Sequence, residues 1–401
     1  MSEPLLDGLT VLDFTRVLAG PYCTRLLADL GARVIKVERP GEGDETRRGY
    51  LQLEDARNDQ ATYFVRVNAG KLSVGLDLSR PEGRAVALDL ARIADVAIEN
   101  FVPGVAAKLG IGAADLRAIN AKLVYCSISG FGQNGALAGS PAFAHIINAM
   151  SGMMDLERNG EATPRVSYLQ AADVLAGTHA FGAILAGLVR RGRTGEGATL
   201  DVSMLQALVA AEDVSYGAIL NGGEVSQGPR VGMIIGDIKG RQVVTQYVGG
   251  PQLWTRLCAV VKRPDIAHDP RFATPVLRRQ HWPELRALLT DWLSTSFTSV
   301  EEALATLNAA RLPAAPVLSP HEVIALPHMA ERQAFPEIPH RGRGAVRVTA
   351  TPFHVDGAPL RPAGPAPWRI GEHTREVLTG VLGYTPARLD ALRASGIIAE
   401  P

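Results

Sequence analysis

The stretch LTVLDFTRVLAGPYCTRLLADLGARVIKVE, residues 9–38, decides the fold class. Residues 9–15 form an apolar run typical of a buried strand, residues 21–32 have the pattern of a helix that ends at a glycine, and residues 33–38 suit a second strand. A strand, a helix and a second strand in this order form the repeating unit of an α/β fold.

The same alternation continues through the first half of the chain. Strand-like runs occur at residues 72–78, 95–101 and 123–132. Between the first two of these, residues 80–94 have a helix pattern, with Ser79 as the expected N-cap and with Pro81 and Glu82 in the first turn. Strands that alternate with helices of this length predict a parallel sheet covered by helices.

The length of 401 residues suggests two or three domains, and the second half contains a boundary. A glycine-rich break, NGGEVSQGPRVG, occupies residues 221–232. Beyond it, a strand-like run and three amphipathic segments predict a smaller mixed α/β unit, at residues 241–248, 251–261, 282–293 and 299–310. A proline- and glycine-rich stretch, residues 336–367, then leads to a final helix at residues 371–383.

The overall composition argues against several classes of protein. Lysine plus arginine and aspartate plus glutamate each number 41, so nothing indicates a surface that binds nucleic acid or a broad area of membrane. A local basic pocket is compatible with this balance. The N-terminus lacks the pattern of a secretory signal, and three scattered cysteines form no disulfide framework. The nine histidines show no metal-ligand spacing. These features predict a cytoplasmic protein without a metal site.

Two common kinds of site do not fit the motifs. The turn after the first strand, RVLAGPYC at residues 16–23, lacks the spaced glycines that let backbone approach a dinucleotide pyrophosphate. SISGFG, at residues 127–132, does not have the order of the G-x-S-x-G elbow of a serine hydrolase. His145 and His179 are candidate general bases, but a lone histidine near an apolar segment is more often a hydrogen-bonded core residue.

One carboxylate stands out. Asp173 directly precedes sixteen residues, 174–189, that carry no charge fixed at neutral pH. This run is short for a membrane span, so we expect a buried core helix. As an N-cap, Asp173 would contribute roughly 0.5–2 kcal/mol to that helix. A carboxylate at the mouth of an apolar segment can also be held there to react, and the position alone leaves both interpretations open.

Eight segments occur in a characteristic order along nearly the whole chain. They are LDGLTVLDFTRVLAGPYCTRLLADLGARVIKVERPGEGDETR, NAGKLSVGLDLSRPEGR, ADVAIENFVPGVAAKLG, GFGQNG, RRGRTGEGATLDVSML, DPRF, ATLNAARLPAAPVLSP and GEHTREVL. Together they resemble the family III CoA-transferases, the group that contains formyl-CoA transferase, carnitine CoA-transferases and α-methylacyl-CoA racemases.

The resemblance implies that Asp173, within AADVLAG, is the catalytic residue. In this family the aspartate attacks an acyl-CoA thioester to form a mixed anhydride, which the CoA thiolate converts into an aspartyl-CoA thioester. The CoA thioester is a substrate, and no metal or tightly bound cofactor is expected. An apolar, water-poor pocket would favour such an attack, and a nearby helix N-terminus would stabilise negative charge. A cap position and a nucleophile are therefore compatible.

The resemblance also implies the residues that line the CoA site. CoA is a large anion, so Arg39, in the loop after a strand, is the expected basic contact, and Lys108 matches a second polar or basic position. The other expected lining residues are Leu18, Ala19, Leu76, Asp77, Leu78, Ser79, Asn100, Phe101 and Val102. Leu76, Leu78 and Val102 also suit an ordinary sheet core.

The chain departs from two relatives at specific positions. The break at residues 221–232 lacks the run of consecutive glycines of formyl-CoA transferase, which argues against oxalate and formate as substrates. The catalytic histidine of the racemases aligns with Phe143, and His145 lies two residues further along. Phe143 is expected to pack against the acyl group instead. Without a histidine opposite Asp173, the acid–base pair that racemisation needs is missing.

The sequence therefore predicts a CoA-transferase that moves CoA from an acyl-CoA donor to a carboxylic acid acceptor. By resemblance, a large Rossmann-like domain comprises residues 1–225 and 331–401, a small α/β domain comprises residues 226–330, and the enzyme is an interlocked homodimer. No nucleic acid or membrane partner is expected. The alternatives are an acyl-CoA racemase that uses Asp173 with a displaced histidine and, third, a non-catalytic acyl-CoA-binding protein.

Overall fold

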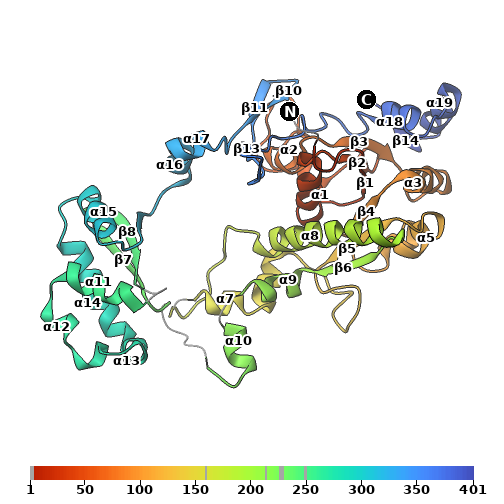
Figure 1. The fold of residues 1–401 in the computed structure, drawn as a ribbon. Coiled ribbons are helices and arrows are strands. Elements are labelled where there is room, and N and C mark those ends of the chain that lie inside the picture. Colours follow the sequence, from red (N-terminus) through yellow and green to blue (C-terminus); the bar gives the residue numbers. More distant parts are fainter. Residues whose placement is uncertain (1–3, 159, 213–214, 225–229, 248–250) are drawn as a thin grey trace. The chain divides into compact units, whose positions relative to one another are not determined.

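The computed structural model describes residues 4–158, 160–212, 215–224, 230–247 and 251–401 (Figure 1). Backbone packing groups the chain into two compact units. The large unit contains Met1–Asp155, Val166–Gly222 and Pro327–Pro401, and the small unit contains Leu156–Arg165 and Gly223–Leu326. The assignment of domains at residues 225 and 330, with a CoA-binding role for the larger one, stays a prediction.

The large unit is built on one twisted sheet of seven strands in the order β14-β3-β2-β1-β4-β5-β6. The strands are β1 (Thr10–Asp13), β2 (Arg33–Glu38), β3 (Leu72–Leu76), β4 (Val96–Glu99), β5 (Val124–Ser129), β6 (Thr199–Ser203) and β14 (Ile398–Ala399). All neighbours pair in parallel except β14, which runs antiparallel to β3 at the edge. The order β3-β2-β1-β4-β5-β6 is that of a doubly wound α/β fold, so the predicted parallel sheet is confirmed.

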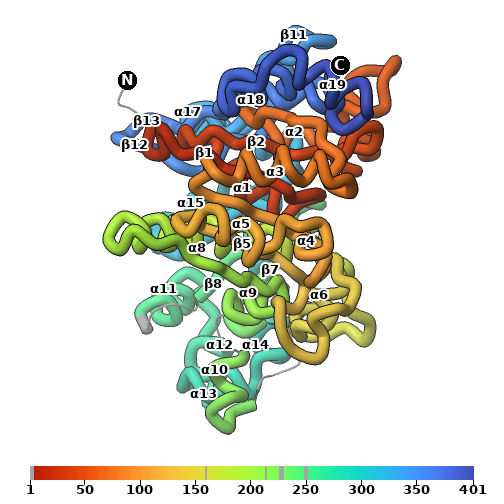
Figure 2. Tube along the Cα trace, turned by 90° about the vertical axis from the view of Figure 1, so that its right-hand side faces the viewer, coloured from red at the N-terminus to blue at the C-terminus, as the bar shows by residue number. Residues whose placement is uncertain are grey.

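Both faces of this sheet are buried because successive side chains of each strand point to opposite sides. Val11 packs toward α1 (Ala19–Asp29), α8 (Ala171–Thr194) and α9 (Met204–Ala211). Leu12, the next residue, packs toward the other layer. That layer consists of α3 (Pro81–Ile93), α5 (Ala113–Ile119), α18 (Thr374–Gly380) and α19 (Pro386–Ala394). Figure 2 shows α18 and α19, in blue, close to the N-terminal strands, which is how the chain end joins the sheet.

Shorter elements complete the large unit. The helices are η1 (Glu45–Arg48), α2 (Thr62–Asn68), α4 (Val105–Lys108), α6 (Ala144–Met150), α7 (Met153–Leu156), α10 (Ser215–Leu220) and α17 (Pro327–Glu331), with α7 ending at the first residue of the small unit. Two antiparallel pairs, β10 (Glu337–His340) with β11 (Gly344–Arg347) and β12 (His354–Val355) with β13 (Ala358–Pro359), follow in the proline- and glycine-rich stretch.

The small unit has a core of its own. An antiparallel sheet of β7 (Met233–Ile238), β8 (Arg241–Gln246) and β9 (Ala314–Pro316) packs on helices. Gly236 of β7 lies directly under Leu293, because an added Cβ would come within 2.7 Å of that side chain. The helices are α11 (Pro251–Val261), α12 (Pro264–Ala267), η2 (Pro270–Phe272), α13 (Pro275–Gln280), α14 (Trp282–Thr295), α15 (Val300–Ala309) and α16 (Pro320–Ala325).

Three local expectations were wrong. The N-cap of α3 is Arg80, because both the backbone N–H and the hydroxyl of Ser79 donate to Asp77 instead. The segment at residues 371–383 is not the last element, since α19 and β14 follow α18. Asp173 is not an N-cap either: α8 begins at Ala171 after Gln170, which places Asp173 in the first helical turn.

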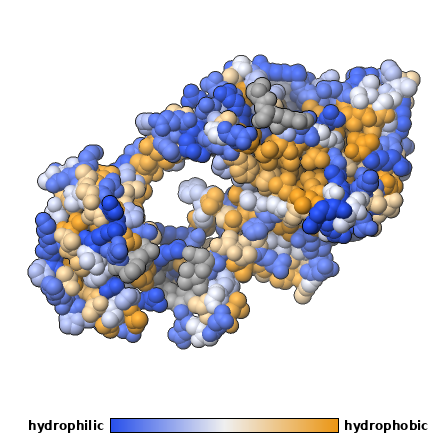
Figure 3. Space-filling view, viewed as in Figure 1, coloured by the Kyte–Doolittle hydropathy of each residue, from blue (hydrophilic) through white to orange (hydrophobic). Residues whose placement is uncertain are grey.

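Helix α8 is the longest apolar helix of the large unit. Its length and composition would allow it to cross a membrane, but core helices of soluble proteins meet the same criteria. It packs against α1, α9 and β5, and 39% of its most apolar window is buried. Figure 3 shows apolar side chains gathered on this face of the large unit, in the region of α8.

Candidate active site

The candidate site lies where the winding of the sheet reverses. After β1 the chain enters α1 on one face, and after β4 it enters α4 and α5, which belong to the opposite layer. In an open α/β sheet, ligands bind beyond the carboxyl ends of the strands at such a switch point. Two cavities open there, and Arg16, which follows β1, and Phe101, which follows β4, line both of them.

The loop after β1 is strained and tightly held. Val17 has φ 67°, a left-handed conformation that is an outlier for a β-branched residue. The side chain of Asn100 fixes Arg16, the residue before Val17. The Arg16 backbone N–H donates to Asn100 Oδ1, and Asn100 Nδ2 donates to the Arg16 carbonyl, each at 2.8 Å. The Val17 N–H donates to Asp44 Oδ1 at 3.3 Å. Surrounding contacts therefore impose this loop conformation, as they commonly do at functional sites.

Asp173 lies where the first turns of two helices meet. Its carboxylate accepts hydrogen bonds from its own backbone N–H in α8 and from that of Ala19, the first residue of α1. Both donors belong to helix first turns, whose N–H groups have no partner within the helix. Gly177, one turn after Asp173, permits this approach, because an added Cβ would lie 2.5 Å from the Ala19 carbonyl oxygen. The predicted helix N-terminus near the carboxylate is thus that of α1.

The environment of Asp173 makes it an unusual acid. Burial raises its pKa from 3.8 to about 6, although the two backbone N–H groups and the charge of His145 oppose the rise. At pH 7 to 8 the group is therefore mostly a carboxylate that is poorly hydrated, as a nucleophile requires. His145 is exposed on α6, and His179 is exposed on α8, where its Nδ1 contacts the Leu175 carbonyl at 2.8 Å.

The cavity around Asp173 has a volume of about 290 Å³ and is mainly apolar. It brings together six predicted site residues: Ala19, Asn100, Phe101, Val102, Phe143 and Asp173. Arg16 and Glu45 supply the other charges of its lining. The exposed ring of Phe143 borders this cavity, whereas His145 does not line it. The arrangement suits a small acyl group beside the carboxylate.

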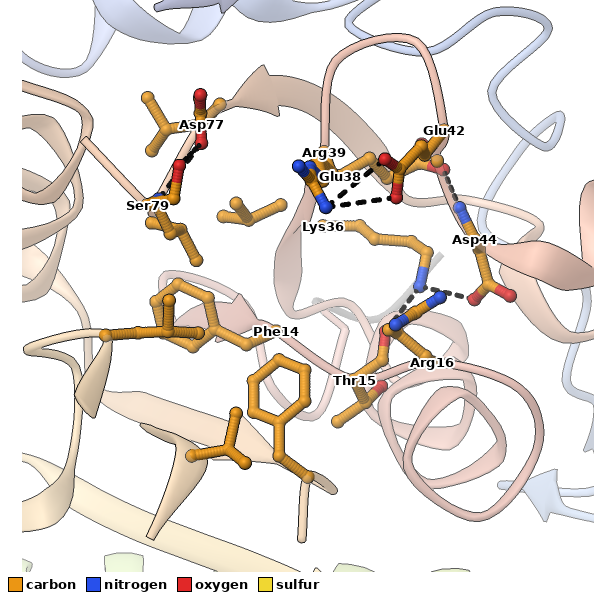
Figure 4. A pocket seen from close by; sticks show the side chains of 17 residues that line it. Phe14, Thr15, Arg16, Lys36, Glu38, Arg39, Glu42, Asp44, Asp77 and Ser79 are labelled. Carbon is orange, nitrogen blue, oxygen red and sulfur yellow. Dashed lines mark hydrogen bonds and ion pairs between the residues drawn. The ribbon is translucent and has the colours of Figure 1, made fainter. Parts of the chain in front are cut away.

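The neighbouring cavity, of about 270 Å³, collects most of the remaining predicted residues (Figure 4). They are Arg39, Leu76, Asp77, Leu78 and Ser79, together with Phe101. Arg39 is exposed and paired with Glu42 at 3.2 Å, so its guanidinium is free to exchange partners. Leu18 and Lys108 line neither cavity: Leu18 is buried just before α1, and Lys108 is exposed at the end of α4.

Buried ion pairs support the floor of this cavity, and the sequence analysis missed them. Lys36 Nζ donates to the Thr15 carbonyl at 2.8 Å and pairs with Asp44 at 3.0 Å (Figure 4). Arg47 binds Glu38 through two hydrogen bonds of 2.8 and 2.7 Å. The signal was present in RVIKVE, because Lys36 and Glu38 lie in a strand covered on both faces and buried charges need partners.

A third buried pair holds the end of β1. Lys71 Nζ donates to Asp13 at 3.1 Å, to the Pro21 carbonyl at 3.0 Å and to Asn68 Oδ1 at 2.8 Å. Burial alone would raise the pKa of Asp13, but the charges of Lys71 and Lys36 outweigh it and hold that pKa at about 2. The pair ties β1 to the segment after α2 and so fixes the start of the strained loop.

The part of the chain that the structure describes contains no group of three or more His, Cys, Asp or Glu side chains arranged to hold a metal ion. Residues 225–229 of the glycine-rich break, on which the argument about oxalate rests, lie outside the described residues. The fold and the site together define an α/β protein with a carboxylate of raised pKa beside a switch-point cavity.

Comparisons with known proteins agree over almost the full length. Residues 6–374 match CoA-transferase family III. Succinate–glutarate CoA-transferase from Agrobacterium fabrum is 34% identical, over 94% of this chain and 95% of that protein. Formyl-CoA:oxalate CoA-transferase from Streptomyces coelicolor is 32% identical, over 99% of this chain and 100% of that protein. The crystal structure of a CaiB/BaiF family protein from Brucella suis superposes with a TM-score of 0.80 at 30% identity, over 94% of this chain and 100% of that one.

The chain belongs to CoA-transferase family III. The predicted family and the predicted CoA-transferase function are thereby confirmed.

Proposed function

We propose that Asp173 is the nucleophile of this enzyme and carries the acyl group and then CoA through covalent intermediates. The observation that supports this most directly is the position of its carboxylate: it borders an apolar cavity, has a raised pKa and is held by the Ala19 N–H. The adjoining cavity suits CoA because Arg39, which lines it, can bind a phosphate group.

The exchange needs four steps that balance without an external reagent. A carboxylate oxygen of Asp173 attacks the donor thioester carbonyl, and the carbon–sulfur bond breaks, which gives a mixed anhydride and CoA thiolate. The thiolate attacks the aspartyl carbonyl, and the donor acid leaves as its carboxylate. The acceptor carboxylate then attacks the aspartyl-CoA thioester and releases thiolate, which finally attacks the acceptor carbonyl and frees Asp173. Covalent catalysis thus divides one difficult exchange into smaller steps.

The residues around Asp173 have distinct tasks in this scheme. The Ala19 N–H, at the N-terminus of α1, stabilises negative charge on the aspartyl group. Val102 and Phe143 supply apolar surface at the rim of the cavity, and a substrate that covers it would limit the access of water to the anhydride. Arg39 is placed to contact the phosphates of CoA.

Trapping with hydroxylamine tests the intermediate. During turnover with an acyl-CoA donor, hydroxylamine is expected to convert Asp173 into a hydroxamate, which peptide mass spectrometry detects. Asp173→Ala is expected to lower transfer by several orders of magnitude while CoA affinity is largely kept. Wild-type turnover in that variant would contradict the proposal.

A racemase is the second candidate, because the charge of His145 acts on Asp173. It predicts exchange of the α-proton of an acyl-CoA with deuterated water and no trapped hydroxamate. An acyl-CoA-binding protein, the third candidate, would show neither signal. Exchange without trapping would therefore contradict the proposed Asp173 intermediate.

The quaternary structure and the substrate pair belong to the proposal as well. We propose a cytoplasmic homodimer, supported by the apolar helix α8, of whose most apolar window a single chain buries only 39% (Figure 3). Light scattering measures the molar mass in solution, which is expected to be twice that of one chain. The relatives described above are named for glutarate and oxalate, both dicarboxylic acids. A donor-by-acceptor screen, starting with succinyl-CoA and read by mass, identifies the pair used here.

A further inference from the structure

Arg16 occupies a position that the mechanism above does not use. It is the third residue after β1, and it lines both the cavity around Asp173 and the cavity beside Arg39. Among the residues that line the cavity of Asp173, it is the only one with a permanent positive charge. Figure 4 shows it beside Thr15 at the edge of the neighbouring cavity.

The guanidinium of Arg16 is available for a ligand. Its ion-pair partner, Glu45, lies 3.4 Å away, and the two side chains are 46% and 57% exposed. An exposed pair of this kind contributes only about 0–1 kcal/mol, so an anion with better geometry can replace Glu45. Arginine is well suited to such an exchange because its planar fork can bind a carboxylate through two parallel hydrogen bonds.

The backbone of Arg16, by contrast, is fixed. Two hydrogen bonds of 2.8 Å join it to the side chain of Asn100, and Val17, which follows, is held in its left-handed conformation. Because the backbone of Arg16 is already held, a ligand that binds its guanidinium has to order only the side chain. Strain retained at such a position indicates that the direction of Arg16 matters to function.

From these observations we infer that Arg16 binds the far carboxylate of a dicarboxylic substrate. The inference rests on the proposed function. When one end of a diacid is bonded to Asp173, its other end is an anion in the cavity that Arg16 lines, and an anion that gives up part of its hydration there gains from a cationic partner. Arg16 is that partner. With a monocarboxylic acid the same place holds a methyl group, and Arg16 stays with Glu45.

Matched pairs of acceptors test this assignment. Glutarate and pentanoate have equal carbon chains and differ in the far carboxylate, as do succinate and butyrate. With one acyl-CoA donor, kcat/KM is measured for each acid, and the diacid-to-monoacid ratio is the readout. The wild-type ratio is expected to exceed one. Arg16→Gln is expected to lower it by about 10- to 100-fold, the range expected for losing hydrogen bonds to a charged group. Arg16→Lys is expected to recover part of the loss.

Glu45→Gln is the control in the opposite direction. It removes the competing carboxylate and keeps Arg16, so the diacid-to-monoacid ratio is expected to rise. A ratio that falls in this variant would contradict the exchange of partners.

Two results would overturn the assignment and leave the transferase mechanism intact. One is a wild-type enzyme that transfers CoA to monoacids better than to diacids. The other is an Arg16→Gln variant in which both acids decline in parallel while the KM of the CoA donor rises, which would place Arg16 on the carrier. If the wild type forms no new thioester with any acid, the proposed function itself fails.

Discussion

Replacing Asp173 by Asn should stabilise the protein while it abolishes transfer. The pKa of Asp173 is raised from 3.8 to about 6, chiefly by burial, so the folded state binds a proton more tightly than the unfolded state. For such a group, the stabilising contribution is fully present below pH 3.8 and is lost as the pH rises toward 6. Above pH 6 the folded enzyme carries an unfavourable charge that Asn lacks.

The magnitude follows from the two pKa values. A difference of about two pH units corresponds to about 3 kcal/mol of unfolding free energy at pH 8, an upper limit because part of the side chain contacts solvent. At pH 4.5 the folded group keeps its proton, and the pH lies less than one unit above the unfolded pKa of 3.8, so the same relation gives about 1 kcal/mol. The Asn variant should therefore exceed the wild type by an amount that grows by about 2 kcal/mol between pH 4.5 and pH 8.

Urea unfolding followed by circular dichroism measures this difference at a series of pH values. Asp173→Ala serves as the control, because it also removes the charge but leaves the Ala19 N–H without its acceptor, at a cost of about 1–3 kcal/mol. An Asn variant that is no more stable than the wild type at pH 8, or a gain that does not change with pH, would refute the claim that Asp173 is a destabilised carboxylate.

Three further predictions concern the same region. First, kcat/KM for transfer should fall tenfold per pH unit below about pH 6, because the protonated form of Asp173 is no nucleophile; a flat profile down to pH 5 would contradict this. Second, Gly177→Ala should lower kcat by at least about tenfold, since its Cβ would displace Ala19. Gly182→Ala, on the same helix with open space around it, should keep activity and gain up to about 1 kcal/mol in unfolding free energy. Equal activities of the two variants would count against the close approach of α1 and α8. Third, Asp13→Asn leaves Lys71 buried without its partner charge and should lower the unfolding free energy by about 3–5 kcal/mol, against no measurable change for the exposed Asp7→Asn.

The sequence was sufficient for the central strands and insufficient for the edges of the sheet. β1, β2, β4 and β5 each contain consecutive or alternating apolar residues because helices cover both of their faces, and this makes them visible in the sequence. The strand β6 was missed since its residues alternate between exposed and half-buried, and β14 was missed since only two residues pair with β3. Short or exposed edge strands have no comparable apolar signal.

The candidate site divides in a similar way. Asp173 could be singled out because the helix after it is free of charge, but the partner that holds its carboxylate, the Ala19 N–H, is a backbone group about 150 residues away in the chain. Asn100 lines a cavity, as expected. Its two hydrogen bonds to the Arg16 backbone could not be predicted, because they join two loops that are distant in the sequence. Contacts between distant backbone groups follow from the strand order, which no local pattern contains.

Two cavities that share only Arg16 and Phe101 make the site modular. In the proposed mechanism one half recognises the carrier, which is the same for every acyl-CoA, and the other half meets the acyl group, which differs between substrates. Substitutions at Val102 or Phe143 can therefore change the acyl preference while the residues around Arg39 keep their contacts. Enzymes with this arrangement can therefore change their acid substrate through substitutions in the wall of one cavity, while the CoA-binding cavity stays the same.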